Sequence, residues 1–275
     1  PAGRRAGGSG GIDPDGPDDP TFGDLLFPDN LLVTLYGAPQ LERTILGRRS
    51  VRGAARELEL RVRPYERRGD RPVVPGFDLI AVVANSTPGP DRKYRTRQPD
   101  ELIATYLEAV RELDGRLMLD IQPGRSTALT EIVALKRWIA APDVDVAIAP
   151  EWNVGPRGVP GRTTGRIKAA EINAASLRLD RIVENENLPP KVLVVHQFTK
   201  RMVKGRARIK QRPGVQVAMN FDGIGSPPAK EAGYGALATE GLFNGFSVFL
   251  LLDSREMGAG AILGMLPTVD FLMLQ

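Results

Sequence analysis

Short apolar runs alternate with amphipathic stretches along most of the chain. Eight runs have the length of a strand, at residues 31–36, 78–84, 116–122, 144–149, 191–197, 215–221, 246–252 and 269–274. Between several of them, apolar residues recur at helical spacing, as in residues 51–62, 99–113, 126–139 and 168–185. Strands that alternate with helices are typical of a parallel sheet, and eight of them predict one closed barrel. The fold class we expect is therefore α/β, a single (β/α)8 TIM-type barrel.

Two segments depart from this alternation. Residues 226–241 are rich in Gly, Ala and Pro, so we expect an irregular connection after the sixth strand. Residues 1–28 are rich in Gly, Pro and Asp and contain few apolar side chains, which predicts a flexible tether before a barrel domain at residues 29–275. Such tethers are common in exported and lipid-anchored proteins. We therefore expect a membrane tether through a leader that precedes this sequence.

Composition narrows the chemistry. The 275 residues are 42% hydrophobic and 25% charged, and no apolar run reaches the ~18 residues of a transmembrane helix. A net charge of +4 is small, so we expect no nucleic-acid partner. There is no cysteine and one histidine, which excludes disulfides, thiolate sites and multi-histidine metal centres. We expect neither a metal nor a cofactor, and composition does not fix the oligomeric state.

Polar residues stand at the carboxyl ends of the predicted strands. In a parallel barrel these ends converge on one mouth, where active sites lie. Side chains alternate along a strand, which puts Asp120 with Gln122 on one inward face and Asn220 with Asp222 on another. The direction of the side chains at the end of the fifth strand is ambiguous, because either His196 or Gln197 could point inward. The candidate site residues are Tyr36, Asn85, Asp120, Gln122, Glu151, Trp152, His196, Gln197, Asp222 and Asp253.

Three carboxylates, Asp120, Glu151 and Asp222, suit acid/base chemistry on a glycosidic bond. Two carboxyl groups ~5–5.5 Å apart give retention, and ~6.5–9.5 Å gives inversion. Trp152 follows Glu151, and an apolar neighbour raises a carboxyl pKa as a general acid requires. We therefore expect Glu151 to be the acid and Asp120 or Asp222 the base or nucleophile. The other seven candidates would surround the sugar, although Asp253 also resembles a helix N-cap.

Other functions fit the same residues. A barrel that binds a glycan or an envelope partner without cleaving it needs the same polar mouth. A phosphate-ester or metal-assisted hydrolase could use Asp120, Glu151 and Asp222 as oxygen ligands. Basic residues also cluster in two predicted mouth loops, around Arg92–Arg97 and Arg157–Arg166, where they could grip an anionic group.

Three segments carry a resemblance to a known family. Residues 119–126 (LDIQPGRS), 150–152 (PEW) and 194–198 (VVHQF) resemble uncharacterised actinobacterial secreted proteins and lipoproteins, from about residue 31 to the C-terminus. The resemblance implies an exported cell-envelope protein. More loosely, the layout looks like glycoside-hydrolase barrels, many of which carry a Glu at the end of strand four, where Glu151 stands. The retaining superfamily with that acid also ends strand seven in Glu, whereas this chain has Leu252-Asp253 there.

Overall fold

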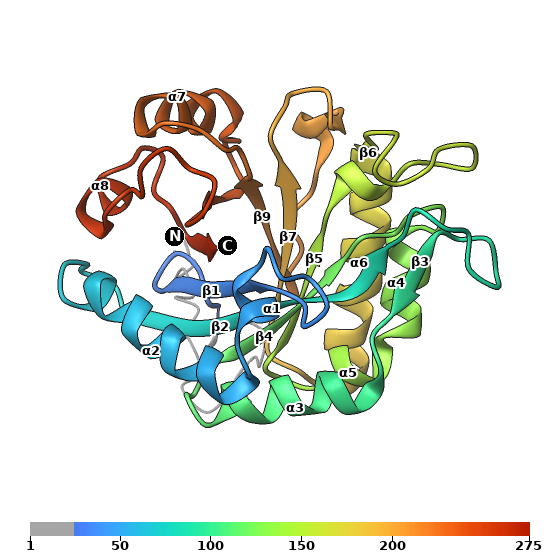
Figure 1. Ribbon diagram of the computed structural model, residues 1–275, viewed down its shortest axis with the longest axis horizontal. Helices are drawn as coiled ribbons and strands as arrows, with labels where there is room; N and C mark the ends of the chain where they lie inside the picture. Colours follow the sequence, from blue (N-terminus) through green and yellow to red (C-terminus); the bar gives the residue numbers. More distant parts are fainter. Residues whose placement is uncertain (1–24) are drawn as a thin grey trace, which may run out of the picture.

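Eight parallel strands close into a barrel in the computed structural model, which describes residues 25–275 (Figure 1). The barrel closes because β1 pairs with both β2 and β11, which confirms the (β/α)8 fold. In barrel order the strands are β1 (Leu31–Gly37), β2 (Val73–Ala84), β4 (Arg116–Ile121), β5 (Val144–Ile148), β7 (Lys191–Gln197), β9 (Val215–Phe221), β10 (Phe243–Val248) and β11 (Phe271–Leu274).

Helices surround the barrel, as Figure 1 shows. They are α1 (Ile45–Arg48), α2 (Val51–Glu66), α3 (Asp100–Arg111), α4 (Ala128–Ala134), α5 (Lys136–Ile139), α6 (Ala169–Glu186), α7 (Pro227–Leu237) and α8 (Ala259–Leu263). Short elements in the connections are β3 (Arg95–Arg97), β6 (Ile167–Lys168), β8 (Val203–Lys204) and the 3₁₀ turns η1 (Pro150–Trp152) and η2 (Arg206–Arg208). None of the helices in residues 25–275 has the length and apolar character needed to cross a bilayer.

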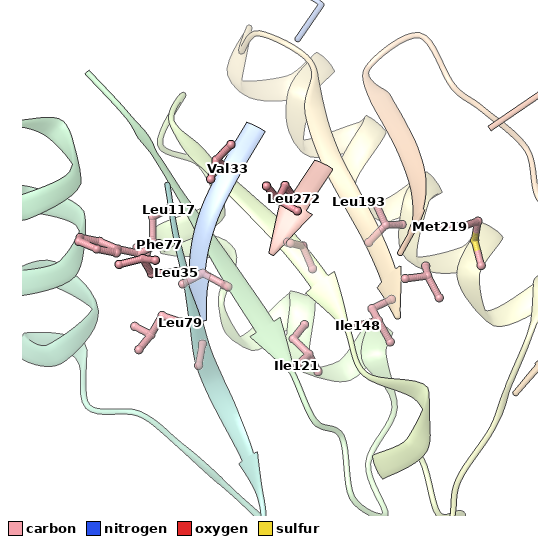
Figure 2. Close-up of a cluster of buried hydrophobic side chains, with 14 of the residues drawn as sticks. Val33, Leu35, Phe77, Leu79, Leu117, Ile121, Ile148, Leu193, Met219 and Leu272 are labelled. Atoms are coloured by element: carbon pink, nitrogen blue, oxygen red, sulfur yellow. The ribbon is translucent and has the colours of Figure 1, made fainter. Parts of the chain in front are cut away.

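Strand alternation divides the apolar side chains into two clusters. The outer cluster lies between the strands and the helices and includes Val33, Leu79 and Leu193 (Figure 2). The inner cluster fills the barrel and includes Leu32 and Met118. Complete burial of one such side chain contributes roughly 1.5–3 kcal/mol, so both clusters stabilise the barrel that carries the polar mouth.

The amino-terminal end of the barrel is closed by the chain before β1. Leu26 and Phe27 are buried in the inner cluster, and both their backbone N–H groups donate to Oε1 of Gln216. The predicted boundary at residue 28 is therefore too late, because these apolar side chains and their hydrogen bonds belong to the barrel. Most of the predicted tether, residues 1–24, lies outside the described residues.

Strand β2 begins at Val73, five residues before the predicted start. The pairing of β2 with β4 shifts between Ile80 and Val82, which is a β-bulge. Regular alternation that turns the candidate Asn85 into the barrel would also turn Ala81 inward, but Ile80 packs in the inner cluster and Ala81 in the outer one. The bulge changes the phase, and it leaves Asp78 inside the barrel.

Two connections differ from the prediction. An 11-residue helix, α7, follows β9 where an irregular connection was expected. One of its two glycines has a packing role, since a Cβ on Gly233 would lie 2.5 Å from the Phe221 ring. Strand β10 ends at Val248 and not at Leu252, which is exposed in the following turns. The connection after β7 holds no α-helix; it contains only β8 and η2.

Candidate active site

A cavity of about 630 Å³ opens at the carboxyl ends of the strands. Five of the predicted site residues line it: Tyr36, Gln122, Glu151, Trp152 and Asp222. Apolar side chains complete the wall, among them Ile80, Phe198 and Phe221. The mixture of apolar wall and a few polar groups is typical of a small-molecule or sugar site.

Glu151 lies on η1, the turn that follows β5. Pro150 begins this turn, which carries the Glu151 side chain over the barrel mouth. Its Oε2 is buried and has no hydrogen-bond partner among residues 25–275. Burial, together with the negative charge of Asp222, raises the pKa of Glu151 to about 8. A carboxyl group with that pKa is protonated at neutral pH and can donate a proton.

Asp222 follows β9 and lines the same cavity. Burial raises its pKa above the ordinary value, while His196 and a hydrogen bond with Ser247 oppose that rise. Both opposing groups favour the carboxylate form. Its backbone N–H donates to the carbonyl of Gln197, which fixes the chain as it leaves β9. Burial and a neighbouring carboxyl raise the pKa of both cavity carboxyls and His196 opposes both rises, but only Asp222 also has Ser247 and Lys230 acting to lower its pKa.

Beneath the cavity, His196 and Asp120 form a buried pair. Nε2 of His196 lies 3.5 Å from Oδ2 of Asp120, and the two side chains are 2% and 0% exposed. On the other side, Nδ1 of His196 lies 2.9 Å from the amide of Asn220. Burial would lower the pKa of His196, but Asp120, Asp222 and Asp78 outweigh it and raise that pKa to about 10. His196 thus carries a positive charge inside a group of carboxyls.

Asp78 is the residue that sequence reasoning missed. It is fully buried on β2, and neither carboxyl oxygen has a hydrogen-bond partner among residues 25–275. Burial and the charge of Asp120 raise its pKa well above the ordinary value, which favours the protonated form of this carboxyl. A signal was present, since an Asp between Phe77 and Leu79 in a strand must face the opposite side from them.

Tyr36 and Gln122 form part of the cavity wall together. Nε2 of Gln122 donates to the Tyr36 hydroxyl at 3.4 Å, and Oε1 of Gln122 accepts from the backbone N–H of Ala84 at 3.0 Å. Burial and the nearby carboxylates raise the pKa of Tyr36 well above 10, so its hydroxyl keeps its proton. Both side chains are therefore fixed polar groups at the base of the cavity.

Five predicted site residues do not line this cavity: Asp120 and His196, which lie beneath it, and Gln197, Asn85 and Asp253. The side chain of Gln197 donates to the carbonyl of Leu237 and accepts from Arg206, which leaves His196 as the inward residue of β7. Asn85 donates to Thr96 across the β2–β3 hairpin. Asp253 forms a buried ion pair with Lys230 of α7 and accepts from the backbone N–H of Gly225, so it ties the turns after β10 to α7 and the loop before it, and it does not cap a helix.

Two of the basic residues in the predicted loop around Arg92–Arg97 form ion pairs within the protein. Arg95 and Arg97 both contact Glu131, a fully buried carboxylate at 2.9 and 2.7 Å from their Nε atoms. These two arginines therefore hold β3 against α4. Across residues 25–275, no three His, Asp or Glu side chains are arranged to hold a metal ion.

Comparisons of the sequence with known proteins find no relative, whereas comparison of the fold finds distant similarity to solved structures. No family model matches the chain, and no curated protein gives a significant match. Among solved structures, the chain is similar to a GH18 chitinase from Pseudoalteromonas aurantia, at 10% sequence identity and a TM-score of 0.30. The match covers 88% of this chain and 92% of that chain.

Proposed function

We propose that this protein is a glycoside hydrolase that cleaves an envelope or extracellular polysaccharide at the barrel mouth. The observation that carries this proposal is the pair of unlike carboxyls, Glu151 and Asp222, on one cavity. The resemblance of residues 119–126, 150–152 and 194–198 to exported proteins supports the choice of an extracytoplasmic substrate.

Glu151 would be the general acid. Cleavage of a glycosidic bond requires a proton on the leaving oxygen, and a carboxyl with a pKa of about 8 still holds its proton at neutral pH. Asp222 would be the base or the nucleophile, because it lines the same cavity and because Ser247 and Lys230, which act on Asp222 alone, oppose the rise that burial gives its pKa. This division of roles between two carboxyls follows the usual glycosidase pattern.

Asp120 receives a different role from the one expected. It is fully buried, does not line the cavity and contacts His196. We propose that it holds His196 in its charged form, and that this charge in turn lowers the pKa of Asp222. Asp120 would thus be a positioning residue, and Asp222 takes its place as the partner of Glu151.

The cavity wall suits a sugar ring. Trp152 and Phe198 supply aromatic surface for the apolar face of a sugar, while Tyr36 and Gln122 supply polar groups. A cavity of about 630 Å³ is of the size that ligand sites have, which is roughly 300–1,000 Å³.

The test is hydrolysis of a panel of bacterial cell-wall and extracellular polysaccharides, measured as release of reducing ends. Glu151→Gln should reduce the rate about 10²–10⁴-fold, the usual contribution of a general acid. Glu112→Gln, an exposed change in the link between α3 and β4, is the matched control and should leave the rate unchanged. Equal rates in wild type and Glu151→Gln would remove the proposed acid, and binding without any hydrolysis would favour a glycan-binding barrel.

A further inference from the structure

Two loops at the mouth concentrate the positive charge of the protein. Residues 153–168 follow η1, and residues 199–214 follow β7. Together they hold eleven of the 37 Lys and Arg residues and no Asp or Glu. Because the whole chain has a net charge of +4, the remainder is acidic overall. Figure 1 shows the first loop at the upper right and the start of the second at the top of the view, beyond the carboxyl ends of the strands, and the second loop then returns to the start of β9.

The first loop presents four exposed basic side chains. None of the four has an ion-pair partner among residues 25–275. A residue outside the loop holds it in place, because Nε of Arg125 donates to the carbonyl of Gly158 at 2.7 Å. The exposed residues are Arg157, Arg162, Arg166 and Lys168.

In the second loop, two arginines form hydrogen bonds with neighbouring elements, and the other five basic side chains form no ion pair with residues 25–275. Arg206 donates to Oε1 of Gln197 and Arg212 to Oγ of Ser176, each at 3.0 Å, which ties the loop to β7 and α6. The five basic residues without an ion-pair partner in the described part of the chain are all exposed: Lys200, Arg201, Lys204, Arg208 and Lys210.

The two loops join where β6 pairs with β8, and this pairing brings like charges together. Lys168 and Lys204 are partners in the parallel register, so their side chains leave the same face of strands about 4.8 Å apart. Both are exposed, and like charges at this spacing repel each other. They border a cavity of about 510 Å³ together with Arg208 and Lys210. Bound anions would relieve that repulsion.

We propose that these loops bind an acidic polysaccharide whose chain continues into the cavity of Glu151 and Asp222. The two cavity residues Trp152 and Phe198 directly precede the two loops, so the basic surface begins where the cavity ends. This inference rests on the proposed function, since it names the substrate class of the same site. Single-stranded nucleic acids are usually held by aromatic stacking as well as charge, and neither loop contains an aromatic residue.

The experiment measures binding in a Glu151→Gln background, so that hydrolysis does not interfere. The probes are polygalacturonate, which carries carboxylates, phosphomannan, which carries phosphates, and fully methyl-esterified polygalacturonate as a neutral counterpart. We expect binding of one or both acidic polymers, weakening with salt, and no binding of the neutral polymer. Adding Lys204→Gln, Arg208→Gln and Lys210→Gln should weaken the binding about tenfold.

The matched control removes three exposed charges from α2, with Arg52→Gln, Arg56→Gln and Arg63→Gln. This control should bind the acidic polymers as tightly as its parent. An equal loss in both triple variants would overturn the inference, as would equal binding of the neutral polymer or tighter binding of single-stranded DNA. If only the loop variant loses binding and the wild type cleaves no glycan, the result would support binding of acidic polysaccharide by the two loops and would refute the proposed hydrolase activity.

Discussion

Nε2 of His196 lies 3.5 Å from Oδ2 of Asp120 in the interior of the barrel, and both side chains are closed to solvent. The separation is at the long end for a hydrogen bond, so the contact is mainly electrostatic. With Asp222 and Asp78 nearby, the pKa of His196 is raised to about 10. The positive charge of His196 is what allows acidic residues to share this interior.

We predict that His196 is doubly protonated at pH 7. Nδ2 of Asn220 lies 2.9 Å from Nδ1 of His196. A charged imidazole donates from both nitrogens, so the Asn220 amide must turn to present its Oδ1 to Nδ1 as the acceptor. Its Oδ1 is a buried atom with no other partner among residues 25–275. The ¹⁵N chemical shifts of the ring nitrogens measure this directly. A neutral ring with its proton on Nε2 would contradict the prediction.

The raised pKa of His196 also predicts how stability varies with pH. A folded-state pKa of about 10, above the ordinary 6.5, gives a stabilisation that is complete below pH 6.5 and is lost as pH rises toward 10. His196→Gln should lack this part of the pH dependence. Urea unfolding of both proteins at pH 6 and pH 10 gives the change in the free energy of unfolding between the two pH values. An equal change in the wild type and in His196→Gln would contradict the assigned charge.

Amide substitution should affect stability much less at Asp78 than at Asp120. Burial and the charge of Asp120 favour the protonated form of Asp78, so Asp78→Asn should change the free energy of unfolding by less than about 1 kcal/mol. Asp120→Asn removes the carboxylate beside a charged His196 and should destabilise the fold by about 3 kcal/mol. Thermal unfolding of the two variants gives the comparison. Equal effects of the two substitutions would contradict the special role given to the contact between Asp120 and His196.

The activity should fall on the alkaline side of a pH optimum. Loss of the Glu151 proton sets that limb, at a pH of about 8. Since the charge of Asp222 contributes to the raised pKa, Asp222→Asn should lower the pKa of Glu151 and move the limb of any residual activity to lower pH. A pH–rate profile of both proteins tests the coupling, and an unmoved alkaline limb in Asp222→Asn would show that the two carboxyls act separately.

The barrel could be predicted from the sequence because its strands are short apolar runs separated by helical patterns. Glu151, Asp222 and Gln122 were found at its mouth by their position at strand ends. Alternation along β9 also predicted correctly that Asn220 faces inward, where it contacts His196.

The errors come from features that a local pattern does not contain. The bulge between Ile80 and Val82 reversed the phase of β2 and hid Asp78. Strand β10 ends before Leu252, and only the ion pair with Lys230 explains why Asp253 lies away from the cavity. Helix α7 forms despite its glycines because Gly233 packs on Phe221, a contact made only in the folded barrel.

The carboxyl carbon of Glu151 offers the most direct measurement. Protein labelled with ¹³C in its Glu side chains is titrated by NMR, and Glu151→Gln identifies the resonance. A midpoint near pH 8 is predicted, because burial and Asp222 oppose ionisation. A midpoint near the ordinary value of 4.5 would leave Glu151 ionised at neutral pH and would contradict its role as the proton donor.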